Sequence, residues 1–282
     1  MNWETAKTWL IAAFFILDLV LGWQLYQGRQ EIIGYTESYS DLLANTKTLL
    51  AEHGFSLDAA VPTTHPDMPS LHADPSAPDL KSLAHDVFPQ AKSVTVDPTT
   101  QVASTASGKV KYLGSGQWQV SFNKPVRIAG SSLSPVMSTI WHGTDYVSDP
   151  VLSQSDSMAF LQAYNGYPIF DAPLWVDVSG NNVMGYTQSA IANISPVGQA
   201  KPIISALDAL DSLANVVDKS TSSTDNRILR VDLGYARKAA ANPSPNAAAS
   251  TYWFPVWRVV TTGQVYFVNA LTGEVETSSG PF

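Results

Sequence analysis

The chain of 282 residues has a formal net charge of −8, 45% hydrophobic residues, 14% charged residues and no cysteine. This is a globular composition, and an acidic chain without clustered Lys and Arg is not expected to bind nucleic acid. The lack of cysteine excludes disulfides, thiolate zinc sites and thiol nucleophiles.

The first predicted element is an apolar segment, residues 8–26, in which Asp18 is the single charged residue. At about 1.5 Å per helical residue, this length nearly spans the ~30 Å hydrocarbon core of a bilayer. Trp3, Trp9 and Trp23 lie where interfacial aromatics are found. The alternatives are a buried core helix and a cleaved signal peptide, but a signal peptide has a strongly basic start and a small-residue exit.

We therefore expect an uncleaved transmembrane helix at residues 8–26 that anchors the chain in the plasma membrane. The short segment before it, residues 1–7, is expected to be a cytoplasmic stub, because a short N-terminal stub favours an N-inside orientation. The remainder of the chain is then extracellular.

Asp18 marks one face of this helix. An ionisable side chain in hydrocarbon is costly and usually faces a partner helix or water. Helical spacing places Phe14, Leu21, Gly22 and Leu25 on the same face. These five residues are the candidate partner-binding site, and the alternative is a protonated Asp18 that only tolerates lipid.

Residues 27–79 are expected to be membrane-proximal. Apolar residues recur at near-helical spacing in residues 28–53, which predicts an amphipathic helix ending near Gly54. Its apolar stripe could pack on its own domain or on a neighbouring helix. Residues 61–79 contain five prolines and are predicted to be an extended linker without regular structure.

Residues 80–282 are predicted to form one α+β domain of antiparallel sheets packed with helices. Residues 80–88 and 203–217 have helical patterns, whereas residues 110–127 and 168–194 alternate as strand pairs around polar turns. The last block, from Arg227 onward, contains strands separated by a small-residue loop and tight glycine turns.

Motifs for catalysis are weak. No histidine pair has the i, i+3 or i+4 spacing of a helical metal site, and we expect no metal or cofactor. The Ser-x-x-Lys string at Ser121 and Lys124 lies in a predicted strand, where the two side chains point to opposite faces. Five carboxylates could suggest a glycosidase or a calcium loop, although Asp near Gly and Pro normally forms turns. These carboxylates are Asp145, Asp149, Asp156, Asp171 and Asp177.

Aromatic residues are frequent on the predicted strands. Most should be buried, but strand alternation is expected to place some on the outer face, where they would be candidates for a protein interface. The set consists of Trp175, Trp253, Phe254, Trp257, Tyr266 and Phe267.

Three stretches of this sequence together resemble the YycI (WalI) family. The N-terminal stub and helix match through Trp3, Lys7, Leu17, Asp18 and Leu19. The middle stretch is similar through Pro168, Ile169, Phe170, Asp171, Tyr186 and Gln188. The closing strands are similar through Pro255, Trp257, Arg258, Asn269, Ala270, Gly273 and Glu274. The last block also resembles the sheet edge of PepSY-type domains.

The resemblance implies a non-catalytic accessory regulator of the WalRK (YycFG) two-component system. Its expected partners are the sensor histidine kinase (WalK/YycG) and a YycH-like protein, contacted through the membrane helix and the outer domain as a hetero- or homodimer. The alternatives are a membrane-anchored, cell-wall-active enzyme that uses the five carboxylates, and a PepSY-like protease inhibitor.

Overall fold

The computed structural model describes Trp3, Asp18 and residues 38–128, 134–217, 226–237 and 251–277. The chain divides into two compact units, Met1–Thr48 and Leu49–Phe282. Within the described ranges, no helix has both the length and the apolarity needed to cross a bilayer. The predicted transmembrane helix, residues 8–26, lies outside the described residues except for Asp18, so it stays a prediction.

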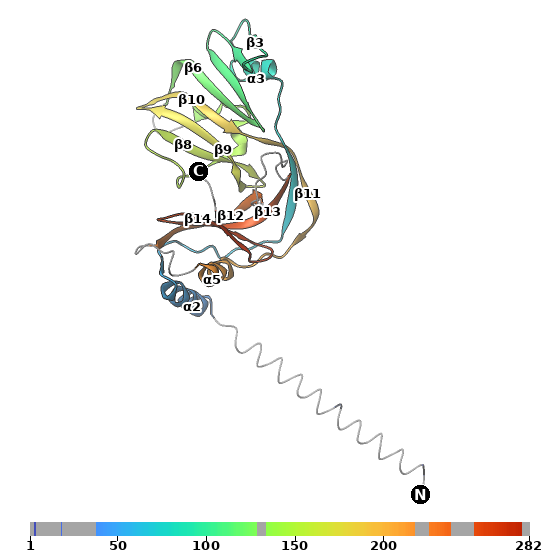
Figure 1. The fold of residues 1–282 in the computed structure, drawn as a ribbon, viewed down its shortest axis with the longest axis vertical. Helices are drawn as coiled ribbons and strands as arrows, with labels where there is room; N and C mark the ends of the chain where they lie inside the picture. Colours follow the sequence, from blue (N-terminus) through green and yellow to red (C-terminus); the bar gives the residue numbers. More distant parts are fainter. Residues whose placement is uncertain are drawn as a thin grey trace. The chain divides into compact units, whose positions relative to one another are not determined.

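The described chain is mostly sheet with a few helices, in agreement with the α+β prediction (Figure 1). The helices are α2 (Tyr39–Glu52), α3 (Leu80–Val87), α4 (Ser134–Met137) and α5 (Ala206–Val216), with a 3-10 helix η1 (Gly143–Asp145). The first strands are β1 (Phe55–Leu57), β2 (Met68–Pro75), β3 (Thr95–Asp97), β4 (Val102–Ser104), β5 (Gly108–Gly114), β6 (Gln117–Arg127), β7 (Tyr146–Ser148) and β8 (Ser157–Tyr164). The others are β9 (Tyr167–Ser179), β10 (Asn182–Ser189), β11 (Ile191–Lys201), β12 (Asn226–Arg237), β13 (Tyr252–Thr261), β14 (Val265–Asn269) and β15 (Val275–Thr277).

The strands form a continuous hydrogen-bonded path in the order β11-β2-β13-β12-β9-β10-β6-β5-β4-β3. The remaining strands branch from it: β1 pairs with β12, β14 with β13 and β15, and β8 with β7 and β9. One parallel pairing, Tyr235 with Ile169, joins β12 to β9. The path therefore consists of two halves that meet at β9, and each half has its own hydrophobic core.

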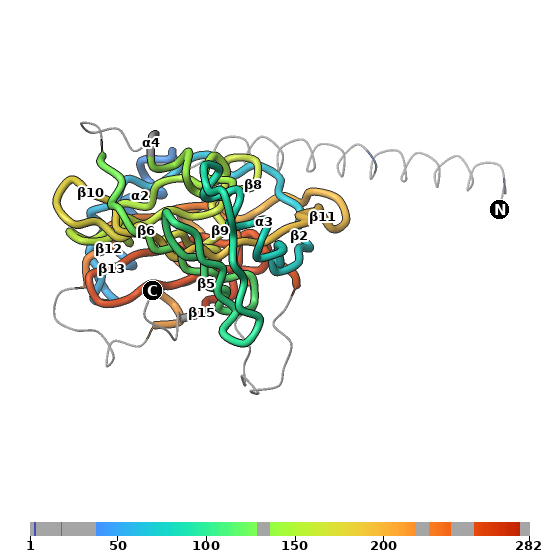
Figure 2. Tube along the Cα trace, turned by 90° about the horizontal axis from the view of Figure 1, so that it is seen from above, coloured from blue at the N-terminus to red at the C-terminus, as the bar shows by residue number. Residues whose placement is uncertain are grey.

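The predicted Pro-rich linker is wrong for residues 68–75, which form β2 in the first half of the path. This strand pairs antiparallel with β11, and the two run side by side in both views (Figures 1 and 2). Its prolines, Pro69 and Pro75, are the second and last residues of the strand, where a missing N–H costs the ladder little. Between them, Leu71 and Ala73 alternate inward and are fully buried.

The predicted amphipathic helix can be followed in part, whereas its position next to a membrane stays a prediction. The helical pattern of residues 28–53 corresponds to α2 from Tyr39 onward, whereas residues 28–37 lie outside the described part. Gly54 follows two residues after the helix with φ 83°, a left-handed conformation that suits glycine at a helix end.

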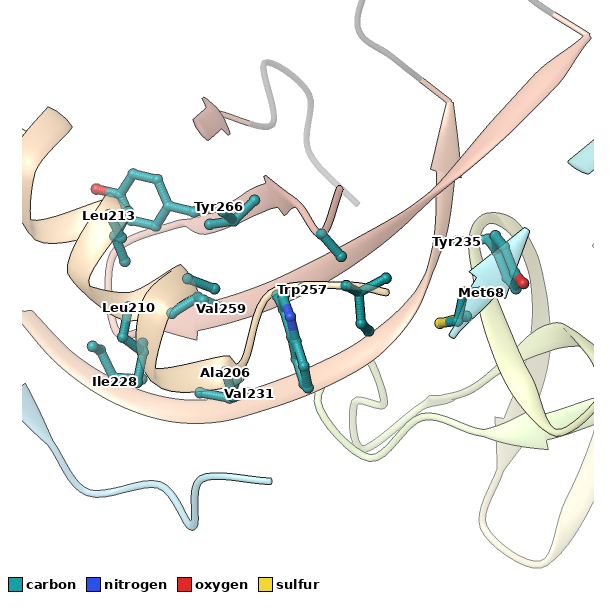
Figure 3. Packing of buried hydrophobic residues seen from close by; sticks show 14 of the residues in the cluster. Met68, Ala206, Leu210, Leu213, Ile228, Val231, Tyr235, Trp257, Val259 and Tyr266 are labelled. Atoms are coloured by element: carbon teal, nitrogen blue, oxygen red, sulfur yellow. The ribbon is translucent and has the colours of Figure 1, made fainter. Parts of the chain in front are cut away.

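The first core lies under α5, which the sequence predicted as a helix. A capping box begins it: the Ser205 hydroxyl accepts from the Asp208 N–H at 3.1 Å, and the Asp208 carboxylate accepts from the Ser205 N–H at 3.1 Å. Leu210 and Leu213 then point to the sheet that contains Trp257 (Figure 3). The indole of Trp257 donates to the Ile204 carbonyl at 3.0 Å, which holds the start of α5 on β13.

The second core lies between α3 and the hairpin of β5 and β6, both predicted from the pattern. Asp79 caps α3 by accepting from the Ser82 N–H at 2.9 Å, and these hydrogen bonds hold the pKa of its carboxyl below the usual range. At the hairpin turn, Gly116 has φ 78°, and a Cβ there would lie 2.6 Å from the Ala190 carbonyl oxygen. This close approach joins the turn to the chain between β10 and β11.

Candidate functional site

The predicted partner-binding face lies almost entirely outside the described residues. Of its five residues, Phe14, Leu21, Gly22 and Leu25 lie outside the described residues. Asp18 is described as helical and exposed. This candidate site therefore stays a prediction.

The structure does not gather the five predicted carboxylates into one site. Asp145 lies at the surface, 3.4 Å from His142. Asp156 is exposed and lies near Asp177. The pKa of Asp177 is raised, first because its carboxyl group is partly buried and second because Asp156 carries a like charge. Asp149 and Asp171 are each held by a different arginine. A glycosidase needs two carboxyl groups that face one scissile bond, and this arrangement does not place them so.

Asp149 belongs to a buried ion-pair network that the sequence analysis missed. Arg258 of β13 donates from Nη1 to Asp149 at 2.5 Å and from Nη2 to Asp232 of β12 at 2.7 Å. Arg230 donates from Nε to the other oxygen of Asp232 at 2.7 Å. The Asp149 carboxylate also accepts from the Val151 N–H at 2.9 Å. Two arginines thus balance two carboxylates, which compensates for their removal from water.

Arg258 is the most enclosed member of this network, because its side chain is only 3% exposed. Its guanidinium carbon lies 4.5 Å from the ring centroid of Phe170, in cation–π range. The Nε of Arg258 has no hydrogen-bond partner among the described residues. A signal for this network was present in the sequence, since Arg258 is a lone charge in the apolar strand β13 and a buried charge requires partners.

A cavity of about 350 Å³ opens beside the network. Both arginines and both carboxylates line it, together with apolar side chains such as Leu161 and Leu233. Cavities of ~300–1,000 Å³ with apolar walls and a few polar groups are typical of small-ligand sites.

Asp171 lies in a separate cluster on β9. Its carboxylate accepts from the indole N–H of Trp253 at 2.7 Å and forms an ion pair with Arg237. The Arg237 guanidinium also lies 5.5 Å from the Trp253 ring centroid. These contacts connect β9 to β12 and β13, so Asp171 stabilises the junction between the two halves of the sheet.

The aromatic residues proposed as an outer interface are mostly internal. Trp253, Trp257 and Tyr266 are buried, whereas Trp175, Phe254 and Phe267 are partly buried. Trp175 and Phe267 pack against a small third core around Phe170. Half of the set is therefore buried, as expected from strand alternation, and the other three residues keep part of their surface exposed. Their role in a protein interface stays a prediction.

The second core contains a cluster of buried polar side chains, namely Tyr146, Tyr186 and Gln188. Gln188 donates from Nε2 to the Trp141 carbonyl at 2.7 Å, and the hydroxyl of Tyr146 donates to the Ser189 carbonyl at 2.7 Å. Burial raises the pKa of Tyr146 and of Tyr186. Both phenols therefore stay neutral at ordinary pH. The Tyr146 hydroxyl has a hydrogen-bond partner, whereas the buried hydroxyl of Tyr186 has none among the described residues.

Two candidates for chemistry remain, the Ser-x-x-Lys string and a metal site. Ser121 and Lys124 lie on β6 as predicted, where the register with β10 is irregular between Ser121 and Val126. In the described ranges, no group of three or more His, Cys, Asp or Glu side chains could hold a metal ion.

These observations define a sheet-rich α+β protein whose buried charges are neutralised within the fold. A comparison with protein-family models then places the sequence: the model described as "YycI protein" matches residues 36–271. The chain belongs to the YycI family. Membership implies a regulatory role in the YycFG two-component system.

Other comparisons add little. No curated protein matches the chain. The crystal structure of an uncharacterized protein from Eubacterium rectale matches 84% of this chain and 99% of its own, with 11% sequence identity and a TM-score of 0.47.

Proposed function

We propose that this chain is a non-catalytic, membrane-anchored regulator that binds and modulates the sensor histidine kinase of the WalRK (YycFG) system, together with a YycH-like protein. The observation that carries the proposal is the family match over residues 36–271. The settings of Asp149 and Asp171 support a non-catalytic role, because both carboxylates are engaged by arginines within the fold.

Modulation requires only that the regulator binds one state of the kinase more tightly than the other. A difference of about 1–3 kcal/mol changes the ratio of the two states 5- to 150-fold. We place the anchor at residues 8–26 in the plasma membrane and the sheet-rich unit on its outer side. In this arrangement the helix can contact the transmembrane helices of the kinase, and the outer unit can contact the YycH-like protein.

Asp18 is the residue through which the helix contact can be tested. A polar contact between transmembrane helices is worth only about 1 kcal/mol, because the separated helices also find partners for their polar groups. We expect Asp18→Leu to reduce co-purification with the kinase about fivefold in mild detergent. Asp18→Asn, which keeps a hydrogen-bonding side chain, should lose less.

Ile16 provides the matched control, since it lies two residues from Asp18 and thus on the opposite face of a helix. Ile16→Ala should leave co-purification unchanged. An equal loss in Ile16→Ala and Asp18→Leu, or no loss in either, would remove the Asp18 face from the mechanism.

The orientation has its own test. Protease added to intact protoplasts should digest the sheet-rich unit, whereas a cytoplasmic protein in the same cells should survive. Protection of the sheet-rich unit would contradict the proposed arrangement.

A further inference from the structure

One edge of β12 is uncovered over part of its length. β13 pairs antiparallel with β12 from Ile228 to Arg237 and thereby occupies one edge. The parallel partners must therefore lie on the other edge, where β1 reaches only as far as Ile228 and β9 pairs only at Tyr235. Among the described strands, none pairs with that edge at residues 229–234. An uncovered strand edge presents backbone N–H and C=O groups to which an extended chain can pair.

The 350 Å³ cavity lies at this gap. Four consecutive residues of β12, from Arg230 to Leu233, form one wall. Residues 147–149 at the end of β7 and residues 166–168 at the start of β9 form others. Pro62 and Thr64, which follow β1, also line the cavity. The cavity therefore lies along Arg230–Leu233, between the segment after β1 and the start of β9, whose Pro168 carbonyl closely approaches Gly234. Its volume suits a short segment that ends inside it rather than a chain that passes through.

The polar groups that line the cavity determine which terminal group of a bound segment fits it. The carboxylates of Asp149 and Asp232 already accept hydrogen bonds from arginines. The buried Nε of Arg258 has no partner within the described part of the chain, and Arg230, whose side chain is 37% exposed, lines the same cavity. Among the charged groups of the lining, the remaining hydrogen-bonding capacity is that of arginine N–H donors, and the hydroxyl residues Thr64 and Ser148 also line the cavity. A carboxylate is the complementary group.

We propose that this cavity binds the carboxyl-terminal end of a short extended peptide. The peptide main chain pairs with the uncovered edge of β12, and its terminal carboxylate accepts hydrogen bonds from Arg258 Nε and from Arg230. Leu161, Leu233 and Pro168 provide apolar walls for small side chains. This inference is independent of the proposed kinase partnership, because it concerns a site within the sheet-rich unit.

In the first experiment, the full-length protein in lipid nanodiscs is titrated with N-acetyl-trialanine, and binding is measured by isothermal titration calorimetry. We expect saturable binding of this acid. The corresponding amide should bind about tenfold more weakly or worse, since it loses the charge-assisted hydrogen bonds of the carboxylate. Acetate should also bind at least about tenfold more weakly, because it cannot pair with the strand edge. Equal binding of acid and amide, binding of acetate as tight as that of the peptide, or no saturable binding of the acid would overturn the proposal.

The second experiment uses two variants of the same strand. Arg230→Gln removes a charge from the cavity while Asp232 keeps its hydrogen bond to Arg258, and it should weaken binding of the acid about tenfold. The control is Arg227→Gln, because Arg227 forms an exposed ion pair with Asp58 at 3.6 Å and does not line the cavity. It should bind as the unaltered protein does. Unweakened binding in Arg230→Gln, with both variants melting like the parent, would contradict the assignment.

Discussion

Arg258 donates hydrogen bonds to two carboxylates in the interior of the sheet-rich unit, and its removal should be costly. Arg258→Met keeps much of the side-chain volume but leaves Asp149, whose side chain is 2% exposed, without its counter-charge. Breaking a buried pair by removing one partner typically costs 3–5 kcal/mol. We expect a loss of about this size in the free energy of unfolding, measured by urea denaturation of residues 38–282 and followed by tryptophan fluorescence.

The reason for this loss can be tested with a second substitution. In the Arg258→Met background, Asp149→Asn removes the uncompensated charge and should recover part of the stability. The exposed pair of Arg227 and Asp58 supplies the comparison, since Arg227→Gln should cost at most about 1 kcal/mol. If Asp149→Asn adds a further loss of its own, the uncompensated charge is not the cause.

At the level of residues, the sequence indicated which side chains are unusual but not which ones meet. Arg258 stands out as a charge in an apolar strand, yet its partners Asp149 and Asp232 lie 109 and 26 residues away. Long-range pairing of this kind depends on the strand order, which spacing along the chain does not contain. The carboxylates were therefore grouped by their proximity in sequence, whereas the fold separates them.

Single elements were easier to predict, because their signals are local. Helix α5 has its capping box and apolar stripe within a dozen residues, and the hairpin of β5 and β6 has alternating residues around a glycine turn. β2 was missed because proline content was weighed above the alternation of Leu71 and Ala73. A short strand between two others gains its stability from pairing, so proline at its ends is compatible with a sheet.

The capping box of α5 gives a prediction at this scale. Ser205→Ala removes the hydroxyl that accepts from the Asp208 N–H, and such a loss typically costs about 1 kcal/mol. We expect a lower melting temperature for residues 38–282, since α5 covers the first core. Ser212, within the same helix, donates to the Asp208 carbonyl at 2.8 Å. Ser212→Ala should be neutral or slightly stabilising because alanine is the better helix former. Equal losses in both variants would show that the cap is not responsible.

For the whole molecule, the position of β2 changes where the folded unit begins. The sequence placed a domain boundary at Leu80, whereas the compact unit extends from Leu49 to Phe282 and includes β1 and β2. The family match, which begins at residue 36, also precedes Leu80. The two strands insert Phe55, Met68 and Leu71 into the first core, each at most 2% exposed.

A fragment that starts at Leu80 should therefore fail to fold. Burial of a large apolar side chain contributes about 1.5–3 kcal/mol, so the loss of Phe55, Met68 and Leu71 removes roughly as much as the ~5–15 kcal/mol that stabilises a typical domain. It also leaves β11 without its strand partner. We expect residues 80–282 to aggregate or to lack a cooperative thermal transition, whereas residues 38–282 should elute as a defined species and melt cooperatively. A cooperative transition in the shorter fragment at the same temperature would show that β1 and β2 are dispensable, and the boundary at Leu80 would then stand.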